Sequence, residues 1–145
     1  MTELYYQDIN WNVSELVGAN CTSLFGLTYK ESDNHPEILF FELNDEKWHR
    51  CYIDTWAGYW VETKPEYLDD IILGDYDGSR KIDYLQLYNL EGQLILKLWC
   101  QRNDNSTYIS IKFVTGVIEY REFDDEDKDG EILFISSQES SYGRL

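Results

Sequence analysis

The segment 125–132, with the sequence DEDKDGEI, has residue types and a spacing that could bind a cation. Its carboxylates stand at alternating positions around a glycine, at Asp125, Asp127, Asp129 and Glu131. A hard cation such as Ca²⁺ needs several converging oxygens, and glycine permits the sharp turn of a calcium loop. However, the twelfth position of such a loop falls on Ser136 and not on the usual glutamate. We therefore favour an acidic hairpin with Asp129 and Gly130 at its turn, and keep calcium as a weak alternative.

A second possible chemical pair is His49 and Cys51, which lie two residues apart in an alternating segment and so share one face of the expected strand. A reactive thiol needs a base and positive surroundings, but the adjacent Arg50 points to the opposite face. The sequence contains no nucleophile elbow, phosphate-binding glycine loop or dinucleotide fingerprint. We expect a protein that is not an enzyme, with no cofactor. A hydrolase that uses an unidentified pair of carboxylates stays open as an alternative.

The segment 48–60 is rich in aromatic residues and contains three tryptophans and two tyrosines. If Trp56 and Tyr59 crown a turn, their rings are exposed near acidic residues and could anchor a basic partner. The other possibility is that these rings fill one end of the core. Together with nearby acids, the candidate partner-binding residues are Trp56, Tyr59, Trp60, Asp69, Asp70, Asp75, Asp77, Asp124, Asp125, Glu126, Asp127 and Asp129.

The net charge limits the kinds of partner that the protein could bind. The chain has 28 acidic and 12 basic residues among 145, for a formal net charge of -16. Such a field repels nucleic-acid phosphates and anionic membranes, and it speeds the encounter with a basic protein. No basic start with an apolar run marks a signal peptide, and no stretch is long enough to span a membrane. The three widely spaced cysteines, Cys21, Cys51 and Cys100, suit reduced thiols, so we expect a cytoplasmic protein.

The elements that must position these residues are mostly strands. The segment 82–114 contains three runs with period-two alternation, which predict a three-stranded antiparallel meander. One face is aliphatic and core-forming, and its residues are Leu85 and Leu87 in the first run, Leu94, Leu96, Leu98 and Cys100 in the second, and Ile109, Ile111 and Phe113 in the third. The other face carries aromatic residues that would lie near one another on neighbouring strands: Tyr84, Tyr88, Trp99 and Tyr108.

The whole chain, 1–145, is predicted to be one β-rich domain. Further strands are expected over 22–30, 37–43, 47–55, 117–123 and 132–135, with another beginning at Tyr59. Pro65 suits the first turn of a helix that stops near Gly74, and the tail from about 137 to 145 is expected to be mobile. The predicted fold is mainly β, an antiparallel meander sheet, curled or barrel-like, with one or two short helices; a two-layer α+β arrangement is the alternative.

In size and composition the chain resembles the immunity proteins that block bacterial toxins. That resemblance implies an inhibitor of a cationic partner. We therefore expect an acidic protein-binding domain that docks or neutralises a basic protein, in an oligomeric state that stays open. A small-ligand-binding β-barrel or cup with an aromatic-lined cavity is an alternative.

Overall fold

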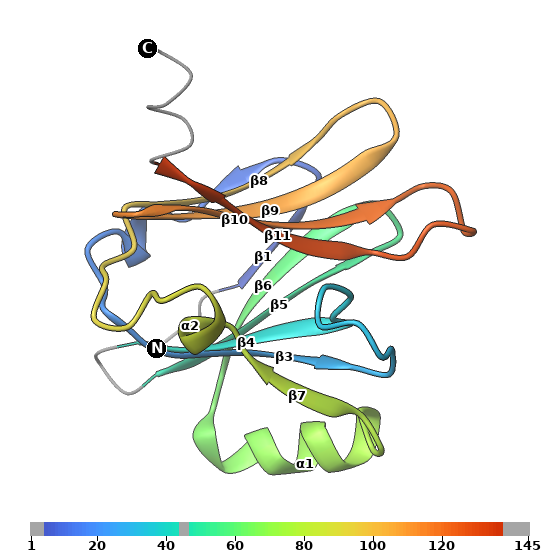
Figure 1. Ribbon diagram of the computed structural model, residues 1–145, viewed down its shortest axis with the longest axis horizontal. Helices are drawn as coiled ribbons and strands as arrows, with labels where there is room; N and C mark the ends of the chain where they lie inside the picture. Colours follow the sequence, from blue (N-terminus) through green and yellow to red (C-terminus); the bar gives the residue numbers. More distant parts are fainter. Residues whose placement is uncertain (1–4, 44–46, 138–145) are drawn as a thin grey trace.

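The computed structural model describes residues 5–43 and 47–137, which form two antiparallel β-sheets packed face to face (Figure 1). Sheet A has the strand order β1-β6-β5-β4-β3-β7, and sheet B has the order β11-β10-β9-β8-β2. The strands of sheet A are β1 (Tyr5–Asp8), β3 (Cys21–Thr28), β4 (Ile38–Leu43), β5 (Trp48–Asp54), β6 (Ala57–Thr63) and β7 (Arg80–Asp83). Those of sheet B are β2 (Trp11–Asn12), β8 (Lys97–Arg102), β9 (Ser106–Phe113), β10 (Gly116–Phe123) and β11 (Glu131–Ser136). The predicted mainly antiparallel β class is confirmed, and the sheets do not close into a barrel.

Helical segments complete the described chain: a 3-10 turn η1 (Ser14–Leu16), and the helices α1 (Pro65–Asp75) and α2 (Tyr84–Leu87). Helix α1 lies across the outer face of sheet A and forms a third layer (Figure 1). Its apolar side chains pack with a second cluster on that face, which contains Phe25, Leu27, Ile38 and Phe40. No helix within the described residues is long and apolar enough to cross a membrane. From residue 138 onward, the predicted tail lies outside the described residues.

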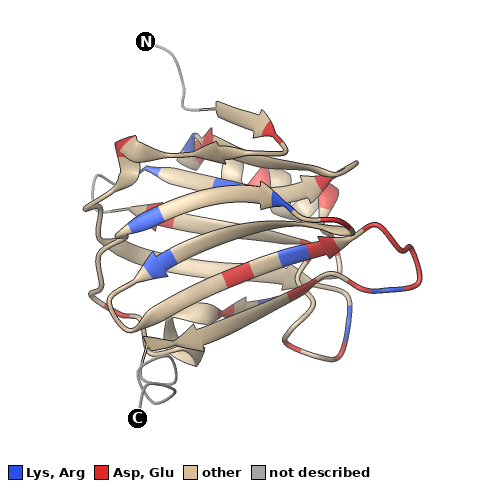
Figure 2. Ribbon diagram, turned by 90° about the horizontal axis from the view of Figure 1, so that it is seen from above, with Lys and Arg blue, Asp and Glu red and all other residues tan. Residues whose placement is uncertain are grey.

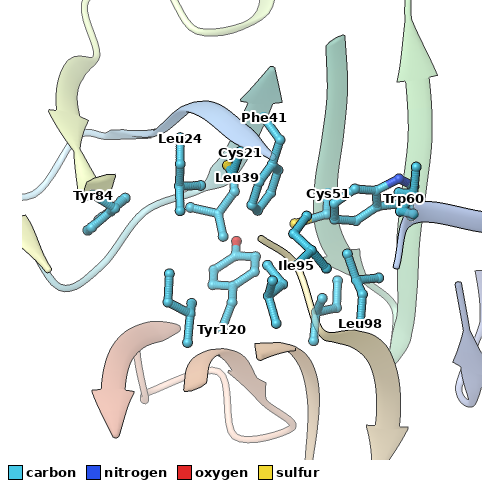
Figure 3. Packing of buried hydrophobic residues seen from close by; sticks show 14 of the residues in the cluster. Cys21, Leu24, Leu39, Phe41, Cys51, Trp60, Tyr84, Ile95, Leu98 and Tyr120 are labelled. Atoms are coloured by element: carbon cyan, nitrogen blue, oxygen red, sulfur yellow. The ribbon is translucent and has the colours of Figure 1, made fainter. Parts of the chain in front are cut away.

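The main core lies between the two sheets (Figure 3). The predicted core face is confirmed within β8 and β9, where its residues are at most 3% exposed: Leu98, Cys100, Ile109, Ile111 and Phe113. It is wrong for Leu94 and Leu96, which are 44% and 42% exposed because they precede β8. Burying each large apolar side chain contributes about 1.5–3 kcal/mol. Two large polar side chains in this core form hydrogen bonds. Tyr120 donates its hydroxyl to the Pro36 carbonyl at 3.1 Å, and the Trp60 indole N–H donates to His49 Nδ1 at 3.1 Å.

The first run of the predicted meander is not a meander strand. Its beginning, β7, pairs with β3 in sheet A, and the chain then turns through α2. The Asp83 carboxylate accepts the backbone N–H of Gln86 at 3.1 Å and so caps this helical turn. Four residues of Tyr-Leu-Gln-Leu fit one helical turn as well as an alternating strand, and the local cap decides between them. The meander is formed instead by β8, β9, β10 and β11.

The four aromatic residues expected on one face are therefore split between two places. Trp99 and Tyr108 lie on the outer face of sheet B, since their neighbours in sequence face the core. Tyr84 is fully buried between the sheets and stacks on Tyr88, which in turn stacks on Phe134. The single aromatic surface suggested by the alternating pattern does not exist, because it required Tyr84 and Tyr88 to be on a strand beside β8.

Candidate functional site: the acidic loop end

Antiparallel pairing brings several connections together at one end of the sandwich. The strands β3, β5, β8 and β10 and the helix α1 all finish there (Figure 1). Their connections touch: the His35 ring donates through Nδ1–H to the Gly130 carbonyl at 2.6 Å, and Thr107 Oγ1 donates to the Trp56 carbonyl at 2.7 Å. We call this region the loop end; it comprises the loops 29–37, 55–56, 76–79, 103–105 and 124–130.

The loop end is strongly acidic (Figure 2). Thirteen of the chain's 28 acidic residues lie in these loops or directly beside them: Glu31, Asp33, Glu37, Asp54, Asp75, Asp77, Asp104, Asp124, Asp125, Glu126, Asp127, Asp129 and Glu131. Three basic residues there are paired with carboxylates, Lys30 with Asp129, Arg80 with Asp33 and Arg102 with Asp124. Lys128 also lies in the loop 124–130, but over the described loops the carboxylates far outnumber the basic side chains, so the surface keeps a large negative potential.

Asp124 fixes the base of the 124–130 loop. Its two carboxylate oxygens accept from the guanidinium of Arg102, one of them at 2.9 Å, and its backbone N–H donates to the Asn105 carbonyl at 2.9 Å. The hydrogen bond from Arg102 lowers the pKa of the Asp124 carboxyl below its ordinary value. The loop is thus held to the neighbouring β8–β9 connection by a bidentate ion pair between Arg102 and Asp124.

The weak calcium alternative finds no support in the arrangement of the loop. Asp125 accepts the backbone N–H of Asp127 at 2.9 Å, and the Lys128 N–H donates to its carbonyl, so the turn spans 125–128 and not Asp129-Gly130 as expected. Asp129 pairs with Lys30 at 3.4 Å, and Glu131 lies in β11 opposite Arg121. Over the described residues, no three acidic, histidine or cysteine side chains come together as metal ligands.

Trp56 lies at the tip of the turn between β5 and β6. Its side chain is 59% exposed, as expected for a ring at a hairpin tip. Thr55 and Trp56 have φ angles of 48° and 72°, values that two-residue hairpins normally assign to Asn and Gly. Such conformations cost about 1–3 kcal/mol each for residues with a β-carbon. The Arg102 guanidinium lies 5.3 Å from the centre of the Trp56 ring, which steadies the ring without covering it.

Two neighbouring cavities open at the loop end. One, of about 380 Å³, lies beside Trp56 and is also lined by Thr107, Phe123 and Glu126. The other, of about 330 Å³, lies beside His35 and Glu37. Both share the carboxyl of Glu122, and neither has tyrosine among its described lining residues. The aromatic-lined cup stays a prediction: Trp56 and Phe123 are the aromatic residues that line the larger of these two cavities.

Glu122 is the residue that the sequence reasoning missed. Burial, followed by the nearby carboxylates of Glu37 and Asp129, raises its pKa from 4.5 to about 7. It continues the core-facing series Ile118 and Tyr120 on β10, so its side chain enters the space between the sheets. The alternation along β10 could have revealed this residue in the sequence, because Glu122 is a carboxylate at the next core-facing position after Ile118 and Tyr120. Gly130 lies directly beside it: a β-carbon at this position would meet Glu122 Oε1 and force the end of that side chain to move.

The other predicted partner-binding residues are dispersed. Tyr59 is half-buried on the outer face of sheet A and stacks on Tyr52 at 4.6 Å. Trp60 is fully buried in the core and presents no surface to a partner. Asp69 and Asp70 are exposed on α1, in the third layer, whereas Asp75 and Asp77 lie where α1 reaches the loop end. Only part of the predicted set therefore shares one surface with Trp56.

The pair His49 and Cys51 also lies in the core. Both residues are buried, and burial raises the pKa of the Cys51 thiol well above its ordinary value, so the reactive thiolate is strongly disfavoured. Cys21, Cys51 and Cys100 are all buried free thiols.

Comparison with known proteins adds no relative: no protein-family model, no curated protein and no solved structure matches the chain.

Proposed function

We propose that this protein is a binding domain that docks a basic protein partner at its loop end and acts without catalysis. The observation that carries the proposal is Trp56, a large ring held exposed at a strained hairpin tip and bordered by the acidic loop 124–130. Aromatic anchors in an electrostatically complementary rim are typical of binding hot spots. A cationic toxin held in this way would be neutralised, as the resemblance to immunity proteins implies.

The rigid attachment of the loop supports the same proposal. Asp124 is tied to Arg102, and the carbonyl of Trp56 is tied to Thr107, so both halves of the surface are fixed by sheet B. A surface that is already ordered loses little conformational entropy when a partner binds. Lysine and arginine side chains of the partner would lie along the carboxylates, with one cation over the free face of Trp56.

The test begins with capture of partners from the native host at low salt and continues with the purified pair. Calorimetric titration at low and physiological salt should show affinity that falls as salt rises. The loop variant Asp125→Asn/Glu126→Gln/Asp127→Asn should weaken binding strongly. A matched helix variant, Glu66→Gln/Asp69→Asn/Asp70→Asn, makes the same charge change on α1 and should leave affinity nearly unchanged. Trp56→Ala should cost about 2 kcal/mol, or about 30-fold in affinity.

The loop and helix variants decide between surfaces. Affinity that survives the loop variant but falls with the helix variant would move the docking surface to α1. Affinity insensitive to both, or to salt, would contradict docking by charge altogether.

One observation favours a second candidate, the hydrolase that uses carboxylates. Glu122 has a pKa raised to about 7 in a cavity that also contains Glu37, and a carboxyl protonated near neutral pH can serve as a general acid. Glu122→Gln distinguishes the two candidates. A screen of chromogenic glycosides with the wild-type protein should show turnover that this variant abolishes if the chain is a hydrolase. The docking proposal expects no turnover in either protein.

A further inference from the structure

The outer face of sheet B has a different balance of charge from the rest of the protein. The strands β8 to β11 place twelve side chains on this face, three from each strand: Lys97, Trp99, Gln101, Tyr108, Ser110, Lys112, Val117, Glu119, Arg121, Glu131, Leu133 and Ile135. Three of them are basic and two are acidic, in a chain whose net charge is -16. Figure 2 looks onto this face and shows basic positions along its strands, whereas acidic residues crowd the loop end.

Two of these basic residues face each other. Lys97 on β8 is the direct cross-strand partner of Lys112 on β9, and both side chains are exposed. Directly opposite Cβ atoms lie about 5 Å apart, and like charges at such positions destabilise a sheet. Over residues 5–43 and 47–137, neither ammonium group forms an ion pair with a carboxylate. The Lys97 Nζ instead lies 4.7 Å from the centre of the Trp99 ring, two positions along the same strand.

The two carboxylates of this face lie beside Arg121 and not opposite the lysines. Glu119 pairs with the guanidinium at 3.3 Å, and Glu131 is the cross-strand partner of Arg121 on β11. Next to the lysines, the row across the sheet continues with Val117 on β10 and then Ile135 on β11, which is 40% exposed. The row therefore presents two positive charges followed by two aliphatic side chains, over three strand spacings that total about 14 Å.

The neighbouring aromatic side chains are held in place by hydrogen bonds. The Trp99 indole N–H donates to Gln101 Oε1 at 3.1 Å, and the Gln101 amide donates in turn to the Tyr108 hydroxyl. The Arg121 guanidinium lies 5.5 Å from the centre of the Tyr108 ring. A surface that is ordered in this way loses little conformational entropy when a partner binds.

The size of this positive face favours a small partner segment. Three rows about 7 Å apart on four strands cover roughly 14 by 14 Å, or about 200 Å². A stable complex of two whole proteins buries about 800 Å² on each partner, so a second copy of the chain would gain too little there. A membrane or a nucleic acid would extend beyond the face onto the acidic loop end and be repelled. A short acidic peptide segment fits the face without reaching that end.

We propose that the outer face of sheet B binds a short acidic segment of a partner protein in an extended conformation. One carboxylate lies between Lys97 and Lys112, where it offsets the repulsion between their ammonium groups. An aliphatic side chain three residues along packs on Val117 and Ile135, because three extended residues span about 10 Å, or two strand spacings. The lysines lie at the end of β8 and β9 away from the loop end, and the inference does not rest on the docking of a basic partner.

The test is a titration with the capped tetrapeptide acetyl-Glu-Glu-Val-Leu-amide at low salt. The backbone signals of Lys97, Lys112 and Val117 in ¹H–¹⁵N NMR should shift saturably, with a Kd of about 1 mM or tighter. The neutral peptide acetyl-Gln-Gln-Val-Leu-amide should bind about tenfold more weakly. Equal affinity for both peptides, or no saturable shift of these signals, overturns the proposal. Tighter binding of this face to phosphatidylserine vesicles or to a single-stranded oligonucleotide also overturns it.

Variants test whether the lysine pair is responsible. Lys97→Gln/Lys112→Gln should weaken peptide binding about tenfold, and it is expected to fold because both side chains are exposed. The matched control Lys64→Gln/Lys81→Gln removes the same two charges away from sheet B, where Lys64 precedes α1 and Lys81 lies in β7. It should bind the peptide as the wild type does. Unchanged affinity in the first variant, or an equal loss in the control, overturns the proposal.

Discussion

The half-buried carboxyl of Glu122 makes a quantitative prediction about stability. Its pKa rises from 4.5 to about 7 on folding, chiefly through burial and then through Glu37 and Asp129. Because the folded-state pKa is the higher one, folding favours the protonated acid. The penalty is therefore absent below pH 4.5, grows as pH rises to about 7, and is constant above that. At about 1.4 kcal/mol per pKa unit the full penalty would be about 3 kcal/mol, and solvent screening of a half-exposed group reduces it to roughly 1–2 kcal/mol.

Replacing this carboxyl by an amide removes the penalty. Glu122→Gln should raise the free energy of unfolding by roughly 1–2 kcal/mol at pH 8 and change it little at pH 4.5. Urea unfolding of both proteins at several pH values between these limits measures the difference. Glu126→Gln is the control. This substitution also removes one negative charge, but Glu126 is exposed in the same acidic loop. An equal gain for both variants would mean that overall charge repulsion, and not burial of Glu122, is responsible. A loss of stability for Glu122→Gln at pH 8 would refute the reasoning.

Three further substitutions test the packing by urea unfolding. Gly26→Ala should lower the free energy of unfolding by about 1–3 kcal/mol, because the new β-carbon would lie 2.7 Å from the Tyr84 ring. Little effect would mean that the ring moves freely. Trp60→Phe should cost about 2–3 kcal/mol by removing the hydrogen bond to His49 and leaving a void, and a neutral result would contradict that packing. Thr55→Gly should stabilise by about 0.5–1 kcal/mol, because glycine adopts a φ of 48° without strain; destabilisation would mean that the turn is not strained.

Most strands could be predicted from the sequence because period-two alternation is imposed by a core on one side. Ile109, Ile111 and Phe113 fall on the buried face of β9 as their spacing predicts. The prediction failed at α2, where a four-residue alternating run also fits one helical turn and the Asp83 cap stabilises that turn. Local capping is a property of one residue and its neighbours, so a pattern counted over a longer window does not detect it.

In the aromatic segment 48–60, the distance of each ring from the turn decides whether that ring is exposed or buried. Trp56 is at the hairpin tip and exposed, while Trp60 is four residues further along β6 and completely buried. Residues 57–63 alternate between the two faces of β6, so the position of the turn fixes which ring faces the core. Treating Trp56, Tyr59 and Trp60 as one cluster ignored that alternation.

The uneven distribution of charge has a structural basis. Most strand positions face the core, the helix layer or their neighbours, so acidic residues collect in connections. In the connections 13–20, 88–96 and 114–115 at the opposite end, the described chain has only Glu15 and Glu91 as acids. Solubility requires no such asymmetry, because the same charges spread over both ends would serve it equally well. Concentrating them around Trp56 places self-repulsion at one end, and a basic partner that covers that end would relieve it.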